Sequence, residues 1–333
     1  MKAIDKPTSC GSAMVRLLGL AAASLLLATQ ARAQAWPERS VRLVVPFPAG
    51  SATDVAMRLI ETALTPRLGH PVVVDNRSGA SGAIGVDAVA KAQPDGYMVG
   101  LVTVSTHAVA PGLGKKLPYD PLADLTPVGM VGSTPYVLVA YPGLGVGNLK
   151  ELLALAKAKP GSLNYGSAGP ASMAHLAAAL LAVEAGVELV HVPYRSSAHA
   201  VTDIMAGRVQ MQFATIPPSL ELIATDKLKA IAVSSRQRSR TLPQVATVAE
   251  QGIAGFEASL WMALVMPPKT PVEIARKLNA ALNAVLSDAK MRDALLVQGL
   301  EVEPGPPEAL MQRIRADMDK WRAVIAKAGI KAE

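Results

Sequence analysis

Short apolar runs alternate along this chain with longer segments in which apolar residues recur at helical spacing. The runs are rich in Val and Leu, as strands buried on both faces of a sheet usually are. They predict strands at residues 41–46, 72–75, 99–104, 137–141, 163–165, 189–192, 209–213 and 228–233. The intervening segments predict helices at residues 52–68, 83–92, 149–157, 171–185, 198–206 and 218–223. This alternation indicates an α/β fold with mainly parallel sheets.

After Trp261 the pattern predicts only helices, at 271–288, 289–298 and 307–328. A mature chain of about 300 residues exceeds what one core usually serves, so we expect two lobes. The apolar stretches 135–140 and 256–266 are long enough to cross between them. Lobe one would then comprise residues 36–134 and 261–333, and lobe two residues 135–260. A ligand is expected in the cleft where the carboxyl ends of both sheets meet.

The first 33 residues have the features of a removable export signal. Lys2, Lys6 and Arg16 form a basic region, Leu17–Ala28 is apolar, and Ala31-Arg32-Ala33 is a small-x-small cleavage site. The apolar run is too short for a membrane span, which needs about 20 residues. Cleavage after Ala33 would place the mature chain in the periplasm of a Gram-negative bacterium, with no membrane insertion. Because the only cysteine is Cys10, the mature chain would have no disulfide.

Charge excludes some partners. The formal charge is +7, and removal of the signal, with four basic residues and one acidic residue, leaves +4. Arg236, Arg238 and Arg240 form the only tight basic cluster, which we interpret as a solvated turn. A nucleic-acid-binding protein would have a denser basic stripe with aromatic residues, so no nucleic acid is expected. The charge predicts only a weak general attraction for anions.

Gly/Ser-rich turns follow the first two predicted strands, and Ser105 and Thr106 follow the third. A turn that opens a helix directs backbone N–H groups at an anion. We predict that they supply half of a ligand site. Gly50 would let the backbone approach the ligand, and Asp54 either caps the helix or binds a donor on the ligand. The candidates here are Phe47, Ala49, Gly50, Ser51, Thr53, Asp54, Ser78, Gly79, Ala80, Ser81, Ser105 and Thr106.

In lobe two the same succession of strand, Gly/Ser turn and helix is predicted in YGSAGPASMAH, residues 165–175. Ser167, Ala168 and Gly169 would offer backbone N–H groups, and Ser172 a hydroxyl. His175, one turn into the following helix, either reaches the cleft or is a structural residue. These turns placed alike around one cleft predict an anion-binding site.

The sequence contains no motif that is typical of a catalytic site. Ser167 lacks the upstream glycine of G-x-S-x-G, H-E-x-x-H is absent, and the five histidines show no metal-ligand spacing. The glycine-rich segment 143–147 lacks the acidic residue that a dinucleotide site requires. We therefore predict a receptor with no catalytic residue, metal or cofactor. An exported hydrolase is the alternative from another class.

Several motifs carry a resemblance that covers nearly the whole mature chain. In order they are WPERSVRLVVPFPAG, VVVDNRSGASG, AQPDGYMV, LNYGSAGPASMAHLAAALL, VELVHVPYRSS, TLPQVATVAEQG and MPPKTP. They resemble those of the Bug/TctC family, the periplasmic solute receptors of tripartite tricarboxylate transporters. The resemblance implies a two-lobed type II periplasmic-binding-protein fold that closes like a flytrap. It implies a small carboxylate ligand held mainly by backbone amides, hydroxyls and water.

The chain departs from the family pattern at three turns. Ser51 stands where a second glycine is usual, residues 78–82 read SGASG in place of PGAGG, and Ala171 occupies a position that is often glycine. Anion binding should survive these changes, but the ligand cannot be carried over. The resemblance implies that the closed form docks on the permease subunits of a tripartite transporter, and we expect a monomer. A sensor that feeds a signalling partner is the alternative.

Overall fold

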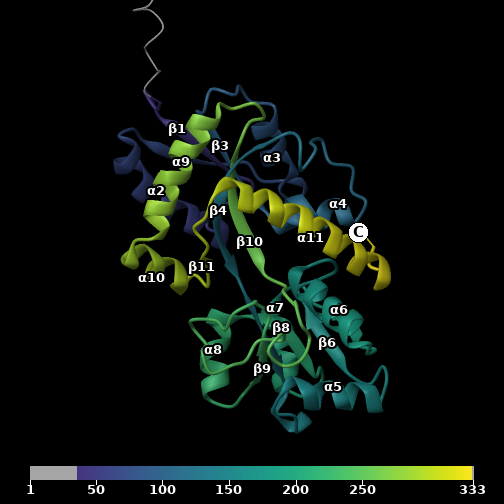
Figure 1. Cartoon of the computed structure of the whole chain (residues 1–333). Coiled ribbons are helices and arrows are strands. Elements are labelled where there is room, and N and C mark those ends of the chain that lie inside the picture. The colour runs from purple at the N-terminus through teal and green to yellow at the C-terminus, as the bar shows by residue number, and fades with distance from the viewer. Residues whose placement is uncertain (1–35, 332–333) are drawn as a thin grey trace, which may run out of the picture. The chain divides into compact units, whose positions relative to one another are not determined.

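The computed structural model describes residues 36–331, and Arg39–Glu333 form one compact unit. The predicted signal peptide, residues 1–33, lies outside the described residues. Within the compact unit the strands form two separate sheets, which Figure 1 shows with β4 and β10 running between them.

The first sheet has six strands in the described chain, in the order β11-β4-β10-β3-β1-β2. These strands are β1 (Val41–Val45), β2 (Val72–Asn76), β3 (Met98–Thr103), β4 (Thr126–Thr134), β10 (Leu260–Met266) and β11 (Glu301–Val302). The second sheet has five in the same part of the chain, in the order β7-β6-β8-β5-β9. They are β5 (Tyr136–Ala140), β6 (Asn164–Ser167), β7 (Val190–Pro193), β8 (Met211–Thr215) and β9 (Lys229–Val233).

The helices flank these sheets. Next to strands of the first sheet come α2 (Ala52–Leu68), α3 (Ala83–Ala90), α4 (Ala110–Gly112), α9 (Val272–Leu286), α10 (Ala289–Val297) and α11 (Pro307–Lys327). Next to strands of the second come α5 (Leu149–Ala158), α6 (Met173–Ala185), α7 (Ser197–Met205) and α8 (Ile216–Ala224). Three short helical turns complete the list: η1 (Ala80–Gly82), η2 (Ser105–Val109) and η3 (Pro142–Leu144).

The expectation of mainly parallel sheets is wrong, because both sheets are mixed. β1 pairs in parallel with β2 and β3, but β10 is antiparallel to β3 and β4, and β11 to β4. In the second sheet β6 is parallel to β7 and β8, whereas β5 is antiparallel to β8 and β9. The cause is the crossover path: β4 leaves the first sheet through Pro135 into β5, and β10 returns in the opposite direction. The predicted division at residues 134/135 and 260/261 remains a prediction.

Local signals set most element boundaries. Helix α2 matches its predicted range because Ser51 caps its start and Gly69, with φ 76°, ends it. Helix α6 begins at Met173 instead of 171, because Ser172 is its N-cap and Ala171 has φ 55°. Two strands were not predicted from the sequence: β4, which Pro127, Gly129 and Gly132 interrupt, and the short β11. Gly132 is where these two strands meet, since a Cβ there would collide with the Glu301 carbonyl oxygen.

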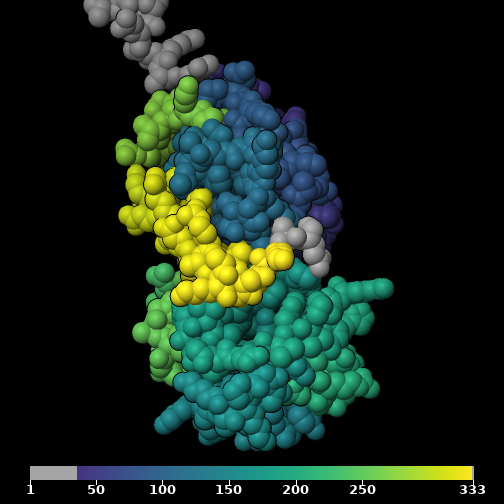
Figure 2. Space-filling view, turned by 90° about the vertical axis from the view of Figure 1, so that its right-hand side faces the viewer, coloured from purple at the N-terminus to yellow at the C-terminus, as the bar shows by residue number. Residues whose placement is uncertain are grey.

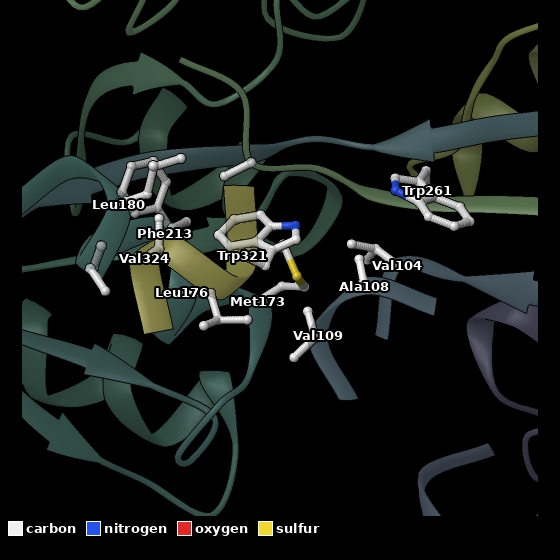
Figure 3. Close-up of a cluster of buried hydrophobic side chains, with 14 of the residues drawn as sticks. Val104, Ala108, Val109, Met173, Leu176, Leu180, Phe213, Trp261, Trp321 and Val324 are labelled. Atoms are coloured by element: carbon white, nitrogen blue, oxygen red, sulfur yellow. The ribbon is translucent and has the colours of Figure 1, made fainter. Parts of the chain in front are cut away.

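Buried side chains of both sheets join in one cluster, drawn in Figure 3. Val104 directly follows β3 and Trp261 lies in β10 of the first sheet, whereas Phe213 lies in β8 of the second sheet and Leu176 in helix α6. Helix α11 supplies Trp321, which is fully buried. Figure 2 shows α11, in yellow, lying across the junction of the blue and teal parts, and it contacts both β4 and α6. The core therefore continues through the crossover region.

Candidate ligand-binding site

The carboxyl ends of strands from the two sheets face each other. β4 runs from the first sheet toward the second, β10 is antiparallel to it, and β3 is antiparallel to β10. Thus β3, with β1 and β2 parallel to it, also ends toward the second sheet. By the same reasoning β8, β6 and β7 end toward the first sheet. Ligands of open α/β sheets bind at such carboxyl ends.

A cavity of about 490 Å³ lies at this junction. The first sheet and its loops contribute Phe47, Ala52, Thr53, Thr103 and Ser105. The crossover strands contribute Thr134, Tyr136, Leu260 and Met262, and the β8–α8 turn contributes Thr215, Pro217 and Pro218. One side of the cavity is closed by residues at the end of α10 and just after it, namely Val297, Gln298 and Leu300. We call this cavity the junction cavity.

A larger cavity of about 580 Å³ lies at the opposite ends of β1 and β3. It is lined by charged residues, but Arg39 pairs with Asp95 at 3.0 Å and Lys91 with Asp87 at 2.7 Å. Because it lies at the amino ends of the strands and its cations are neutralised, it fits an anionic ligand less well than the junction cavity does.

The turn after β1 uses several of its polar groups internally. The buried Asp54 carboxylate accepts hydrogen bonds from Gly50 N at 2.9 Å, Asn76 Nδ2 at 2.8 Å and Arg58 Nε at 3.0 Å. Burial raises the pKa of Asp54, but these hydrogen bonds and the Arg58 charge outweigh it and hold the pKa below its ordinary value. Asp54 therefore ties the turn to helix α2 and strand β2.

The start of α2 retains free donors. Ser51 Oγ accepts from Asp54 N at 3.3 Å and is 3.0 Å from Thr53 Oγ1. The N–H groups of Ala52 and Thr53 have no hydrogen-bond acceptor among residues 36–331. Both residues line the junction cavity, so the positive end of α2 lies beside it. Ala49 and Gly50 lie exposed just before this helix.

The turn after β2 is exposed at Ser78, Gly79, Ala80 and Ser81. Ala80 and Ser81 have φ 47° and 56°, a left-handed conformation rare for residues with a side chain. None of the four lines the junction cavity. The following Gly82 packs close to Thr106, whose Cγ2 would be 2.8 Å from a Cβ at Gly82. The second turn therefore lies against the end of β3.

After β3 the chain enters the turn η2. Ser105 lines the junction cavity, whereas Thr106 is buried. Thr106 Oγ1 accepts from Thr103 N at 3.1 Å and lies 2.9 Å from His107 Nδ1. Burial lowers the pKa of His107 to about 3, so this imidazole is neutral. Thr106 has a structural role in the turn.

The turn after β6 is held by its own side chains. Ser167 Oγ accepts from Gly169 N at 3.1 Å and is 2.7 Å from His191 Nε2. Ser172 caps α6, and its hydroxyl donates to the Gly169 carbonyl at 2.8 Å. Ala168 is exposed. The structure does not bring this turn to the junction cavity.

His175 lies away from that cavity. Its Nδ1 accepts from Ala171 N at 3.1 Å, and its ring stacks on His191 at 3.8 Å. Burial and the neighbouring His191 lower its pKa to about 4. His175 and His191 line a different cavity, of about 310 Å³, beside Lys327 of α11. These contacts give His175 a structural role in its own turn.

Of the predicted site residues, Phe47, Thr53 and Ser105 line the junction cavity. Thr103 at the end of β3 and the residues supplied by the crossover strands and the end of α10, such as Met262 and Val297, were not predicted from the sequence. The C-terminal segment gave no Gly/Ser signal that could have revealed them. No group of three or more His, Cys, Asp or Glu residues within 36–331 is placed to hold a metal ion.

The fold and this junction define the class of two-lobed periplasmic binding proteins. A family model described as "Tripartite tricarboxylate transporter family receptor" matches residues 56–330. The chain belongs to this family, which confirms the resemblance found in the sequence. Protein BugT of Bordetella pertussis is 36% identical over 320 residues, which cover 96% of this chain and 98% of BugT.

Two solved structures extend the comparison. An R. palustris protein with adipate is 34% identical, with a TM-score of 0.71, and the match covers 89% of this chain and 99% of that one. A TctC solute binding protein from Polaromonas, solved with no ligand, is 29% identical, with a TM-score of 0.81, covering 88% and 99%. Within residues 36–331, no helix has both the length and the apolarity needed to cross a membrane.

Proposed function

We propose that this chain is a periplasmic receptor that captures a small carboxylate between its two lobes and delivers it to a tripartite permease. The observation that carries the proposal is the junction cavity at the facing carboxyl ends of both sheets. The positive ends of α2 and α8 border it, and such ends favour an anion. Membership of a receptor family and the adipate-bound relative support the same ligand class.

Capture works as a population shift. A carboxylate that contacts both sheets stabilises the closed arrangement by contacts that the open one lacks. This chain has a TM-score of 0.81 to the ligand-free relative and 0.71 to the adipate-bound one, although the latter is more similar in sequence. The mature receptor would begin at Gln34 after export and act as a monomer without catalysis.

The first test is thermal unfolding of residues 34–333, refolded to remove bound ligand, against mono-, di- and tricarboxylates and aromatic acids. A ligand present at about 100 times its Kd should add about 2.7 kcal/mol of stability. The variant Ala52→Trp places an indole at the cavity and should abolish the shift. Thr62→Trp, exposed on the same helix outside the lining, is the matched control and should retain it.

No shift from any carboxylate, with the fold intact, would refute carboxylate capture. The partner is tested by affinity purification from membranes with and without the stabilising ligand. Ligand-dependent recovery of permease subunits supports transport, whereas recovery of a sensor kinase instead would move the assignment to signalling. Amino-terminal sequencing of the periplasmic fraction tests cleavage after Ala33.

A further inference from the structure

The wall of the junction cavity combines apolar and hydroxyl side chains in register. Thr103 of β3 is opposite Met262 of β10, and Thr134 of β4 is opposite Leu260. Tyr136 of β5 is opposite Thr215 of β8. Side chains of directly opposed residues lie on the same face of a sheet. Each pair therefore presents one larger, mostly apolar side chain and one short hydroxyl side chain to the cavity.

No residue that lines this cavity carries a charge, among the residues that the structure describes. The features that favour an anion are the first turns of α2 and α8, each equivalent to about half a positive charge. Pro217 and Pro218 remove two N–H donors from α8, and Thr215 makes no capping bond there. Together the two helix ends balance about one carboxylate, and a second buried carboxylate would have no cation to pair with.

The hydroxyl of Thr103 is a second feature of the cavity that points to a ligand. Its side chain is 1% exposed, and its Oγ1 has no hydrogen-bond partner in the described structure. Its backbone N–H is bonded to Thr106 Oγ1, so the turn itself does not need the Thr103 hydroxyl. A buried hydroxyl without a partner is unfavourable, and such groups in native proteins require an explanation. Because Thr103 lines the cavity, its hydroxyl is a candidate donor to a ligand oxygen.

The outer side of the cavity is apolar. Val297, the last residue of α10, is 72% exposed although it is a large hydrophobic residue, and it lines the cavity next to Leu300. Phe47 and Pro217 also line the cavity. An apolar ligand body placed there would remove this apolar surface from water, which is favourable. A hydroxylated or doubly charged body would instead lose its own hydration against an apolar wall.

We propose that the ligand is a monocarboxylic acid with an apolar body, aliphatic or aromatic, and that Thr103 donates its hydroxyl to the carboxylate. The apolar body lies against Met262, Leu260 and Val297. This inference rests on the proposed receptor function and narrows its ligand class. It makes Thr103 and Val297 specificity-determining residues.

Calorimetric titration of the mature chain with mono-, di- and tricarboxylic acids tests the ligand class. Hexanoate or phenylacetate should bind at least about tenfold more tightly than adipate or citrate. From butanoate to hexanoate, each added methylene should lower Kd about fourfold. Tighter binding of adipate or citrate, or a Kd independent of chain length, would overturn this inference and leave the receptor function standing. Failure of every acid to bind would overturn both.

Variants test the two residues separately with the tightest-binding acid. Thr103→Val should raise Kd about tenfold or more without lowering the melting temperature of the ligand-free chain, and Thr103→Ser should restore binding. Val297→Asn should weaken the dependence of Kd on chain length. Val272→Asn is the matched control, because Val272 is also an exposed valine at a helix end but does not line the cavity. An unchanged Kd in Thr103→Val would refute the hydroxyl contact.

Discussion

Asp317 of α11 lies at the centre of a buried group of charges, and its removal should strongly destabilise the fold. The carboxylate is 5% exposed and accepts from Trp261 Nε1 at 2.6 Å and Arg313 Nε at 3.0 Å. Lys320 Nζ lies 2.7 Å from its other oxygen. Arg313 also contacts Glu257 at 2.6 Å, so the group joins α11 to the segment that leads into β10.

The magnitude follows from what Asp317→Ala leaves behind. Arg313 is 14% exposed and keeps its ion pair with Glu257. The Trp261 N–H loses its acceptor, and Lys320 is 24% exposed. Removing one partner of a buried ion pair costs about 3–5 kcal/mol. Lys320 can turn partly to solvent, so we expect about 3 kcal/mol, which is a large part of a total stability of about 5–15 kcal/mol.

The assay is urea unfolding of the ligand-free mature chain. Asp319→Ala is the matched control, because Asp319 lies on the same helix, is 81% exposed and pairs with Arg322 at 3.7 Å. We expect the control to remain within about 0.5 kcal/mol of the parent. A loss below about 1 kcal/mol for Asp317→Ala, or an equal loss in both variants, would refute this reasoning.

The same carboxylate should contribute to acid sensitivity. Burial raises the pKa of Asp317, but the charges of Lys320 and Arg313 and the hydrogen bonds from Lys320 and Trp261 outweigh it and lower the pKa. Because the folded pKa lies below the unfolded value, the stabilisation is complete above the unfolded pKa and is lost as pH falls through the folded one. Asp317→Asn should flatten the low-pH limb of stability measured against pH.

Three further predictions concern residues in the first turns of α2, α3 and α6. Asp54→Asn should cost about 2 kcal/mol, because the carboxylate accepts from Gly50, Asn76 and Arg58; urea unfolding measures the loss, and an unchanged midpoint would contradict it. In the folded chain the pKa of His175 is lowered from its ordinary value of 6.5 to about 4. Between these two pH values the unfolded chain binds more protons than the folded chain, so the free energy of unfolding should fall as pH drops from 6.5 toward 4. His175→Asn should reduce that slope in unfolding measured at pH 7 and pH 5, and an unaltered slope would exclude His175 as its source. Gly85→Ala should lower the free energy of unfolding by about 1–3 kcal/mol, because a Cβ at Gly85 would lie 2.7 Å from the Cβ of Pro46. Thermal unfolding measures the loss, and full stability would show that α3 moves freely.

Local chemistry explains how much of the site could be predicted. The Gly/Ser turns after β1 and β6 were located from sequence because a strand, a turn and a helix follow each other within a few residues. What their groups bind was not predictable in this way. Gly50 N donates to Asp54 and Gly169 N donates to Ser167 Oγ, so both predicted ligand donors have protein partners. These contacts depend on side-chain rotamers that a strand–turn–helix pattern does not specify.

The residues that form the wall of the junction cavity could not be predicted from the sequence for a different reason. Thr103 and Met262 become neighbours only through the pairing of β3 with β10, and no local periodicity encodes that register. Strand β4 was missed because its proline and glycines break the apolar run, and pairing on both edges compensates for them.

The sequence by itself determined most of the order of strands and helices, the bounds of the helix at residues 52–68, and the family. These features depend on residues close together in the chain, where side-chain spacing and backbone preference act directly. Only the tertiary structure decided that the sheets are mixed, that Asp317 is buried among charges, and that Thr103 and Val297 face one cavity. Those outcomes depend on contacts between distant segments, which form only when the crossover strands and α11 pack together.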